Sequence, residues 1–272
     1  MNPIRIGKFT SSEIVALTTN GKKADSMGQP FYTYVKRKKQ ERKMGCHLST
    51  NDNSKSLTWG KFLEWWLMFK RPDIIGLEYT LTPETTLSHP EHSGVWVGSK
   101  DGHNNNTNAV IDIKCPYTRE SFADFAECTT IDEVRDNHKA GEQYYWQLVS
   151  NAAISGVNKA ELIVFMPSED QLKEIQGSAI FDDHKFMNDV YFIGSAVDGD
   201  LPFVPKTSVY PNLLRFCFDV PQADIDFLTE RVKIAGELLT EKNNHATKRR
   251  KQNKGVHDGQ LRNHDRKRIG HR

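Results

Sequence analysis

Long hydrophobic runs are missing from this 272-residue sequence, and their absence narrows the class of protein. No stretch of about 18 consecutive apolar residues occurs, so we expect no transmembrane helix and no membrane partner. The N-terminus holds no apolar core of signal-peptide length, so we expect a cytoplasmic protein. Hydrophobic residues still make up 37% and charged residues 26% of the chain, which is typical of a globular domain with a sizeable core.

Cysteine is scarce and scattered, and internal repeats are absent. The four cysteines are Cys46, Cys115, Cys128 and Cys217. They form no CxxC pair, and no group of Cys and His has the spacing of zinc ligands. We therefore expect four reduced thiols, with neither a zinc site nor a disulfide framework.

Charge is distributed unevenly along the chain. Residues 242–272 contain 11 Lys and Arg but only 2 Asp, which gives this segment a net charge of +9. Because the whole chain carries +2, the first 241 residues carry −7. We expect one domain over residues 1–241 and a flexible basic tail over 242–272. Such a tail suits DNA, because Lys and Arg displace counterions from phosphates, but a solvated end without a specific partner explains it equally well.

The order of the predicted elements indicates an α/β or α+β domain, in which a central mixed β-sheet is flanked by helices. Predicted helices cover residues 31–45, 58–70, 131–155 and 221–239, and residues 9–17 are predicted as a helix start with Ser11 or Ser12 as N-cap. Predicted strands fall within residues 77–87, 95–102, 109–114, 160–166, 189–194 and 213–219.

A basic cluster lies in the predicted helix 31–45. It consists of Lys36, Arg37, Lys38 and Lys39. A solvated helix face is the ordinary explanation of such a run, and contact with phosphates is the alternative.

The strand 109–114 carries two charged residues on one face. Residues two apart in a strand point the same way, so Asp112 and Lys114 project together while Ile111 and Ile113 pack on the other side. Charged groups in an apolar strand are costly unless they are paired or bound to something. A salt bridge at the edge of a sheet would explain the pair, and so would a ligand site.

A second carboxylate precedes this strand. Asp101 is separated from Asp112 by a polar, Asn-rich turn, and the spacing fits two adjacent antiparallel strands. The two carboxylates would then lie at one end of the sheet, where they repel each other and need a cation. Mg²⁺ prefers oxygen ligands of this kind, so the spacing predicts a metal site.

Two further polar residues are candidates for the same site. Glu64 is the lone carboxylate on the apolar helix 58–70 and is a candidate third metal ligand, although an exposed edge of that helix would also explain it. Gln147, on the predicted helix 131–155, is a candidate for orienting water or phosphate, but an ordinary polar helix residue is as good an explanation.

Several blocks, taken in order, resemble the PD-(D/E)XK nucleases, and most closely the branch of phage lambda exonuclease and the YqaJ-type viral recombinases. The blocks are Phe9-Thr-Ser-Ser-Glu13, Gly60-Lys-Phe-Leu-Glu64, Gly98-Ser-Lys-Asp101-Gly102, Asp112-Ile-Lys114-Cys-Pro116 and Tyr144-Tyr-Trp-Gln147-Leu. The chain departs from the family pattern at Lys100, where Pro is usual, and at Asp112, where Glu is commoner. Glu78 also competes with Glu64 as the upstream carboxylate, but Gly60 and the helical context favour Glu64.

The resemblance implies a restriction-endonuclease-like core and an exonuclease that hydrolyses linear double-stranded DNA, in phage-type recombination or DNA processing in a bacterial or phage-infected cell. It implies that Glu64, Asp101, Asp112 and the carbonyl of Ile113 hold Mg²⁺, for which Mn²⁺ would substitute. Lys114 would position or deprotonate water or neutralise the phosphate, and Gln147 would hold water or a phosphate oxygen.

The resemblance also implies partners and contacts with the DNA backbone. Ser11, Ser12 and the basic cluster would contact backbone phosphates. A single-strand annealing protein and copies of the chain itself are further partners that the family implies. Three alternatives remain: a structure-specific or restriction-like endonuclease on the same fold, an RNA-directed nuclease, and a non-catalytic DNA-binding recombination protein.

Overall fold

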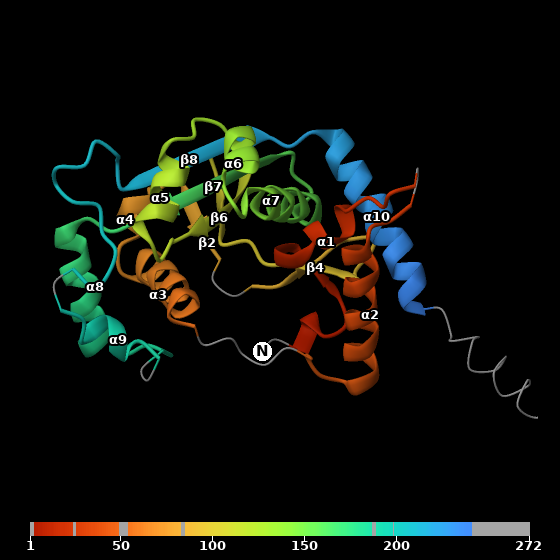
Figure 1. The fold of residues 1–272 in the computed structure, drawn as a ribbon, viewed down its shortest axis with the longest axis horizontal. Coiled ribbons are helices and arrows are strands. Elements are labelled where there is room, and N and C mark those ends of the chain that lie inside the picture. The colour runs from red at the N-terminus through yellow and green to blue at the C-terminus, as the bar shows by residue number, and fades with distance from the viewer. Residues whose placement is uncertain are drawn as a thin grey trace, which may run out of the picture.

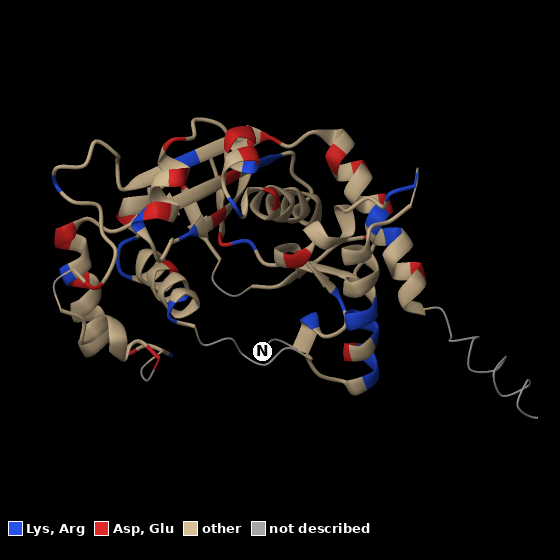
Figure 2. Ribbon diagram, viewed as in Figure 1, with Lys and Arg blue, Asp and Glu red and all other residues tan. Residues whose placement is uncertain are grey.

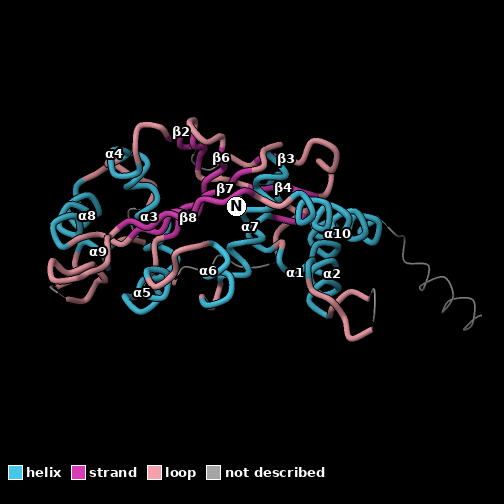
Figure 3. The backbone as a smooth tube through the Cα atoms, turned by 90° about the horizontal axis from the view of Figure 1, so that it is seen from above, coloured by secondary structure: helices cyan, strands magenta, loops and turns pink. Residues whose placement is uncertain are grey.

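The computed structural model describes residues 3–23, 26–48, 54–82, 85–186, 189–197 and 199–240. The predicted basic tail therefore lies outside the described residues. Two mixed β-sheets form the centre of the fold, and helices cover both of their sides (Figures 1 and 3). This arrangement confirms the predicted class, an α/β domain with mixed sheets flanked by helices.

The larger sheet has five strands in the order β2-β5-β6-β7-β8. Its strands are β2 (Tyr79–Leu81), β5 (Gly102–Asn104), β6 (Ala109–Lys114), β7 (Lys159–Phe165) and β8 (Leu213–Asp219). β6 and β7 are parallel, and the other neighbouring pairs are antiparallel. The smaller sheet has the order β1-β4-β3, from β1 (Phe9–Thr10), β4 (Trp96–Gly98) and β3 (Leu87–Ser88).

Helices occupy most of the remaining described chain. They are α1 (Val15–Thr18), α2 (Gln29–Met44), α3 (Lys55–Phe69), α4 (Pro72–Ile75), α5 (Arg119–Ala126), α6 (Ile131–Asn137), α7 (Gly141–Ser155), α8 (Glu169–Phe181), α9 (Tyr191–Gly194) and α10 (Gln222–Thr240), with 3-10 helices η1 (Pro3–Arg5) and η2 (Ser11–Glu13). The predicted helices 31–45, 58–70 and 221–239 correspond to α2, α3 and α10. No helix among the described residues is long and apolar enough to cross a membrane.

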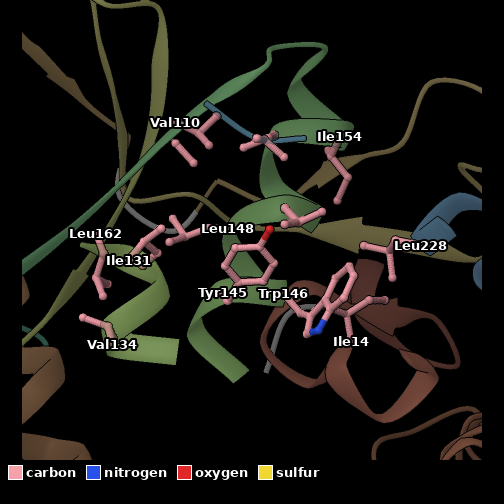
Figure 4. Packing of buried hydrophobic residues seen from close by; sticks show 14 of the residues in the cluster. Ile14, Val110, Ile131, Val134, Tyr145, Trp146, Leu148, Ile154, Leu162 and Leu228 are labelled. Atoms are coloured by element: carbon pink, nitrogen blue, oxygen red, sulfur yellow. The ribbon is translucent and has the colours of Figure 1, made fainter. Parts of the chain in front are cut away.

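The core has two parts, one on each side of the larger sheet. Alternation along β6 sends Val110 to the side of α7, where it joins the cluster around Leu148 and Tyr145 (Figure 4). It sends Ile111 and Ile113 to the opposite side, where α3, α8 and α9 pack. Asp112 and Lys114 therefore lie on a strand that is fixed by apolar packing on both faces.

The predicted helix 131–155 is in fact two helices. His138 adopts an extended conformation after α6 and ends it, and α7 begins at Gly141. A Cβ atom at Gly141 would overlap the carbonyl oxygen of Val134, so the two helices meet more closely than any other residue allows. Between Val134 and Tyr144 the sequence is polar except for Ala140 and Gly141, so the apolar spacing itself lapses at the break.

We predict that Gly141→Ala destabilises the protein by about 1–3 kcal/mol, because the added methyl group forces the α6 and α7 backbones apart. Chemical denaturation, followed by circular dichroism, measures this change. Gly177→Ala on α8 is the matched control, since its Cβ would meet nothing within 4 Å. Gly177→Ala should stabilise the protein by up to about 1 kcal/mol, because glycine in the middle of a helix is less favourable than alanine. Equal effects of the two substitutions would contradict the close approach.

Other predicted elements are wrong in type or were missed. Residues 189–194 contain the single turn α9 and no strand, because the run packs against α8, where Gly194 lies close to Ile180. Residues 9–17 hold β1, η2 and α1, and the N-cap of η2 is Thr10, so neither Ser11 nor Ser12 caps a helix there. The helices α5 and α8 were not predicted.

Candidate active site

The β5–β6 hairpin brings Asp101 and Asp112 to the same end of the larger sheet. Gly102 pairs with Ile111 in antiparallel register, as the spacing predicted. Asp101 lies directly before β5, and its Oδ2 accepts a hydrogen bond of 2.7 Å from the backbone N–H of Ile113. The carboxylate of Asp101 is thus fixed beside the strand that carries Asp112.

Asp112 is buried, with 1% of its surface exposed. Its Oδ1 accepts a hydrogen bond of 2.5 Å from Nε2 of Gln147 on α7. Its Oδ2 forms a close ion pair with the ammonium of Lys114. The structure therefore brings these three sequence-predicted residues together.

Lys114 is held as an ammonium by the surrounding carboxylates. Burial lowers the pKa of this ammonium, but the negative charges of Asp112, Asp101 and Glu64 outweigh burial and raise the pKa above its ordinary value. Its Nζ also lies 5.5 Å from the ring centre of Tyr144, the residue one turn before Gln147, within range of a cation–π interaction.

Glu64, on α3, is the third carboxylate of the group. Burial raises its pKa well above the ordinary value, and the nearby charges of Asp101 and Asp112 raise it further, while Lys114 and Lys61 act in the opposite direction. The alternative residue, Glu78, has its carboxylate against the backbone of Gly76. The structure thus places Glu64, and not Glu78, within electrostatic reach of the two aspartates.

Asp101 shows the same crowding of negative charge. Burial, and after it the charge of Asp112, raise its pKa to about 7, against the opposing effects of Lys114 and the Ile113 hydrogen bond. Three carboxylates this close together repel one another when they are ionised, so they need additional positive charge nearby. The site as described supplies only part of that charge, through Lys114.

The chemistry of these groups fits a hard divalent cation. Carboxylate and carbonyl oxygens are the preferred ligands of Mg²⁺, and Oδ2 of Asp112 is a buried carboxylate oxygen that already attracts a positive group, the Lys114 ammonium. Within the described ranges, however, no three His, Cys, Asp or Glu side chains are already grouped closely enough to hold one ion. The Lys114 ammonium instead lies against Asp112. Binding of a cation would therefore require this ion pair to rearrange.

Helix α7 connects the site to the N-terminal segment. One turn before Gln147, Gln143 donates a hydrogen bond of 2.9 Å to the backbone oxygen of Ser12. One turn after Gln147, the hydroxyl of Ser150 lies 2.8 Å from that of Ser11, and Asn151 donates to the carbonyl of Ser99. A single helix thus sets the position of η2 relative to Asp112.

The predicted phosphate contacts are only partly compatible with the structure. Ser11 is buried and its hydroxyl is paired with Ser150, so its side chain is not available to a phosphate. Ser12 is half-buried beside it, with its hydroxyl 3.5 Å from that of Thr10.

The basic cluster on α2 does not form one surface, because four consecutive residues point to different sides of a helix. Lys38 is buried and paired with Glu41, so it is not a phosphate contact. Arg37 is paired with Glu13, and Lys39 donates to the carbonyl of Leu238 on α10. Lys36 is the one of the four that is exposed. Figure 2 shows basic and acidic residues side by side on α2.

Two charged residues of interest were missed. Arg5, on η1, is partly buried, and its Nε has no hydrogen-bond partner among the described residues. Burial lowers the pKa of this guanidinium, while the charges of Tyr34 and Glu13 act to raise it. No sequence pattern pointed to Arg5.

Glu161, on β7, is the second residue that the sequence analysis missed. It is buried and accepts a hydrogen bond of 2.8 Å from Tyr79. Like Asp112, Glu161 is a lone carboxylate inside an apolar strand. The rule that identified Asp112 would therefore have identified Glu161 as well.

Comparison with solved structures finds exonucleases. An alkaline exonuclease from Laribacter hongkongensis (LHK-Exo) is 16% identical and has a TM-score of 0.54, over 93% of this chain and 95% of that chain. Its complex with dAMP has a TM-score of 0.55 and 16% identity, over 93% and 96%. A phage-related exonuclease from Haemophilus somnus has a TM-score of 0.56 and 15% identity, over 85% and 93%.

No protein-family profile matches the chain, and neither does any curated protein. The likeness to the solved structures covers nearly the whole of each molecule, so it describes the complete fold and not one shared motif. This chain therefore has the fold of alkaline and phage-related exonucleases, as its sequence blocks predicted.

Proposed function

We propose that the protein is a magnesium-dependent exonuclease that hydrolyses phosphodiester bonds of linear double-stranded DNA. The observation that carries this proposal is the convergence of Glu64, Asp101, Asp112, Lys114 and Gln147 at one end of β6. These residues come from α3, the β5–β6 hairpin and α7, and they meet in a fold shared with exonucleases. A buried cluster of carboxylates has little use in a protein that only binds DNA, since it repels phosphates.

Glu64, Asp101, Asp112 and the carbonyl oxygen of Ile113 would hold the cation, and Mn²⁺ would substitute for Mg²⁺. A bound Mg²⁺ supplies Lewis-acid activation of the phosphate and lowers the pKa of water.

The protein's own residues prepare the site for phosphate. Gln147 orients Asp112 through the hydrogen bond to Oδ1, and the Ile113 N–H orients Asp101. In the metal-free site the carboxylates keep Lys114 as an ammonium, which would neutralise the charge of the phosphate. A bound cation would lower the pKa of this ammonium, so positioning or deprotonating water is the second role open to Lys114. In the absence of substrate the same ammonium neutralises Asp112.

The biological setting is a further part of the proposal. We place the enzyme in the cytoplasm of a bacterial or phage-infected cell, in phage-type recombination or DNA processing, with a single-strand annealing protein and copies of the chain as partners. The alternative of an endonuclease on the same fold uses the same residues, so the substrate and not the site distinguishes the two.

The test is digestion of equal amounts of linear and covalently closed circular double-stranded DNA in Mg²⁺. An exonuclease needs an end, so we expect the linear form to disappear and the circular form to persist. Nicking or linearisation of the circle would indicate an endonuclease. Asp112→Asn serves as the inactive control for both substrates, and cleavage by this variant at the wild-type rate would remove the site from the reaction.

A further inference from the structure

The aromatic ring of Tyr144 lies beside the candidate active site, one turn before Gln147 on α7. Residues three apart on a helix lie on the same side of it, so both side chains face β6. Gln147 donates a hydrogen bond to Oδ1 of Asp112. Oδ2 of the same carboxylate pairs with Lys114, whose Nζ lies 5.5 Å from the centre of the Tyr144 ring. One turn of α7 thus contacts both members of this ion pair.

Two other aromatic side chains hold the Tyr144 ring in place. Phe125, on α5, stacks against it with ring centres 5.9 Å apart, and the imidazole of His138 lies 5.6 Å from it. Phe125 and His138 themselves stack at 4.0 Å. The imidazole is fixed in turn, because its Nδ1 accepts a hydrogen bond of 3.1 Å from the N–H of Ala140 and its Nε2 lies 3.1 Å from the hydroxyl of Ser121. Packing on α5 and α7 therefore sets the position of the ring.

The hydroxyl group of Tyr144 takes no part in this arrangement. The side chain is partly buried, yet its hydroxyl forms no hydrogen bond with another residue in the described part of the chain. The face of an aromatic ring carries partial negative charge, which attracts a cation. The ring, and not the hydroxyl, is therefore the part of Tyr144 that the fold holds against Lys114.

An uncharged ring face suits this place better than another carboxylate would. A cation bound to Asp112 would compete with Lys114 for the carboxylate oxygens. An aromatic ring is no ligand for Mg²⁺, so it would keep its attraction for the ammonium whether or not Asp112 is bound to a cation. Lysine is a long, flexible side chain whose ordering costs conformational entropy, and a fixed ring beside Nζ limits the positions open to the ammonium.

We propose that Tyr144 is a positioning residue for Lys114: its ring face holds the ammonium beside Asp112 by a cation–π interaction, and its hydroxyl is dispensable. The proposal rests on the proposed function, because Lys114 belongs to that site. It gives α7 two tasks at the site, orienting the carboxylate through Gln147 and holding the ammonium through Tyr144.

The test changes the charge distribution of the ring and keeps its shape. Tyr144→Phe should digest linear DNA in Mg²⁺ at close to the wild-type rate, because it retains the ring. Pentafluorophenylalanine incorporated at position 144 has a ring of similar size whose electron-poor face no longer attracts a cation. It should lower kcat by roughly 3- to 10-fold relative to Tyr144→Phe. Initial rates at saturating DNA give the measurement.

The matched control is the neighbouring residue Tyr145, whose ring lies 4.2 Å from the guanidinium of Arg135 and not beside Lys114. Phenylalanine and pentafluorophenylalanine are placed there in the same way. The two proteins altered at position 145 should digest DNA at equal rates, because a weakened contact with Arg135 leaves the ammonium of Lys114 in place.

Unfolding in EDTA gives a second readout, which does not depend on digestion. The fluorinated ring at position 144 should lower the denaturant midpoint relative to Tyr144→Phe. This difference should disappear when Lys114→Met is also present, because the cation is then absent from both proteins.

Each outcome decides the proposal. In an active enzyme, equal digestion rates for Tyr144→Phe and the fluorinated protein would overturn it. Digestion by Tyr144→Phe as slow as that by the fluorinated protein would also overturn it, since the hydroxyl would then be required. A midpoint difference that persists beside Lys114→Met would assign the ring to packing alone. A difference that depends on Lys114, in a protein that digests no DNA, would support the ring contact and count against the proposed function.

Discussion

Replacement of Lys114 by methionine is expected to lower the rate of Mg²⁺-dependent DNA digestion by about 10²- to 10³-fold, the usual cost of removing one well-placed charge from a reacting site. Methionine keeps the length of the side chain and removes its charge. The ammonium of Lys114 is the positive group paired with Asp112 and within reach of Asp101 and Glu64. Without it, the site loses a side-chain cation that acts on all three carboxylates and would face an incoming phosphate. Initial rates on linear DNA, at saturating Mg²⁺, give the measurement.

A second substitution separates this effect from a general loss of charge or of fold. The control is Lys159→Met, on the neighbouring strand β7. The Lys159 side chain is partly exposed, and its Nζ lies 3.7 Å from Oδ1 of Asp219. This variant should digest DNA at close to the wild-type rate. The thermal unfolding of both variants should also be measured, because Lys114→Met leaves Asp112 buried beside Gln147 alone. Full activity of a folded Lys114→Met protein would show that the ammonium has no part in the reaction.

The residues at the centre of the site followed from short-range rules, and this is why the sequence predicted their arrangement. Alternation along one strand fixes Asp112 and Lys114 on one face, and a hairpin of the observed length fixes Asp101 beside them. The resemblance of several motifs, in order, to the nuclease family then added Glu64 and Gln147, which no local rule brings near Asp112. The structure shows their proximity through contacts between α3, α7 and β6.

The features that the sequence did not predict depend on packing between distant segments. The run of four basic residues on α2 was interpreted as a solvated face or a phosphate contact, but Lys38 is buried against Glu41, and Arg37 is paired with Glu13 at the surface. Ser11 looked like a phosphate contact, but the helix α7 buries it against Ser150. His184 packs against Phe62 of α3, a contact that no spacing within the chain reveals.

The second large effect concerns stability in the absence of metal. Asp101→Asn is expected to stabilise the metal-free protein at pH 8 by about 2–4 kcal/mol, since one pKa unit corresponds to about 1.4 kcal/mol. Burial and Asp112 raise the pKa of Asp101 from its ordinary value of 3.8 to about 7. The folded protein therefore holds this proton more tightly than the unfolded chain. The resulting stability is complete below about pH 4 and is lost as the pH rises through about 7.

Asparagine has no charge at any pH, and it keeps an oxygen that accepts the hydrogen bond from the Ile113 N–H. In EDTA, the difference in unfolding free energy between Asp101→Asn and wild type should thus grow from pH 5 to pH 8. Denaturant titrations at each pH measure this difference, and Asp170→Asn, at an exposed carboxylate on α8, is the control that should show no such growth.

Addition of Mg²⁺ at pH 8 should reverse the order of the two proteins. A cation bound by the ionised carboxylates stabilises the folded wild type by mass action, and it should have little effect on Asp101→Asn, which lacks one of the charges that would attract it. If the difference in unfolding free energy between the two proteins did not change with pH in EDTA, burial and the charge of Asp112 would not raise the pKa of Asp101. Equal stabilisation of both proteins by Mg²⁺ would instead remove Asp101 from the set of metal ligands, while leaving its electrostatic coupling to Asp112 intact.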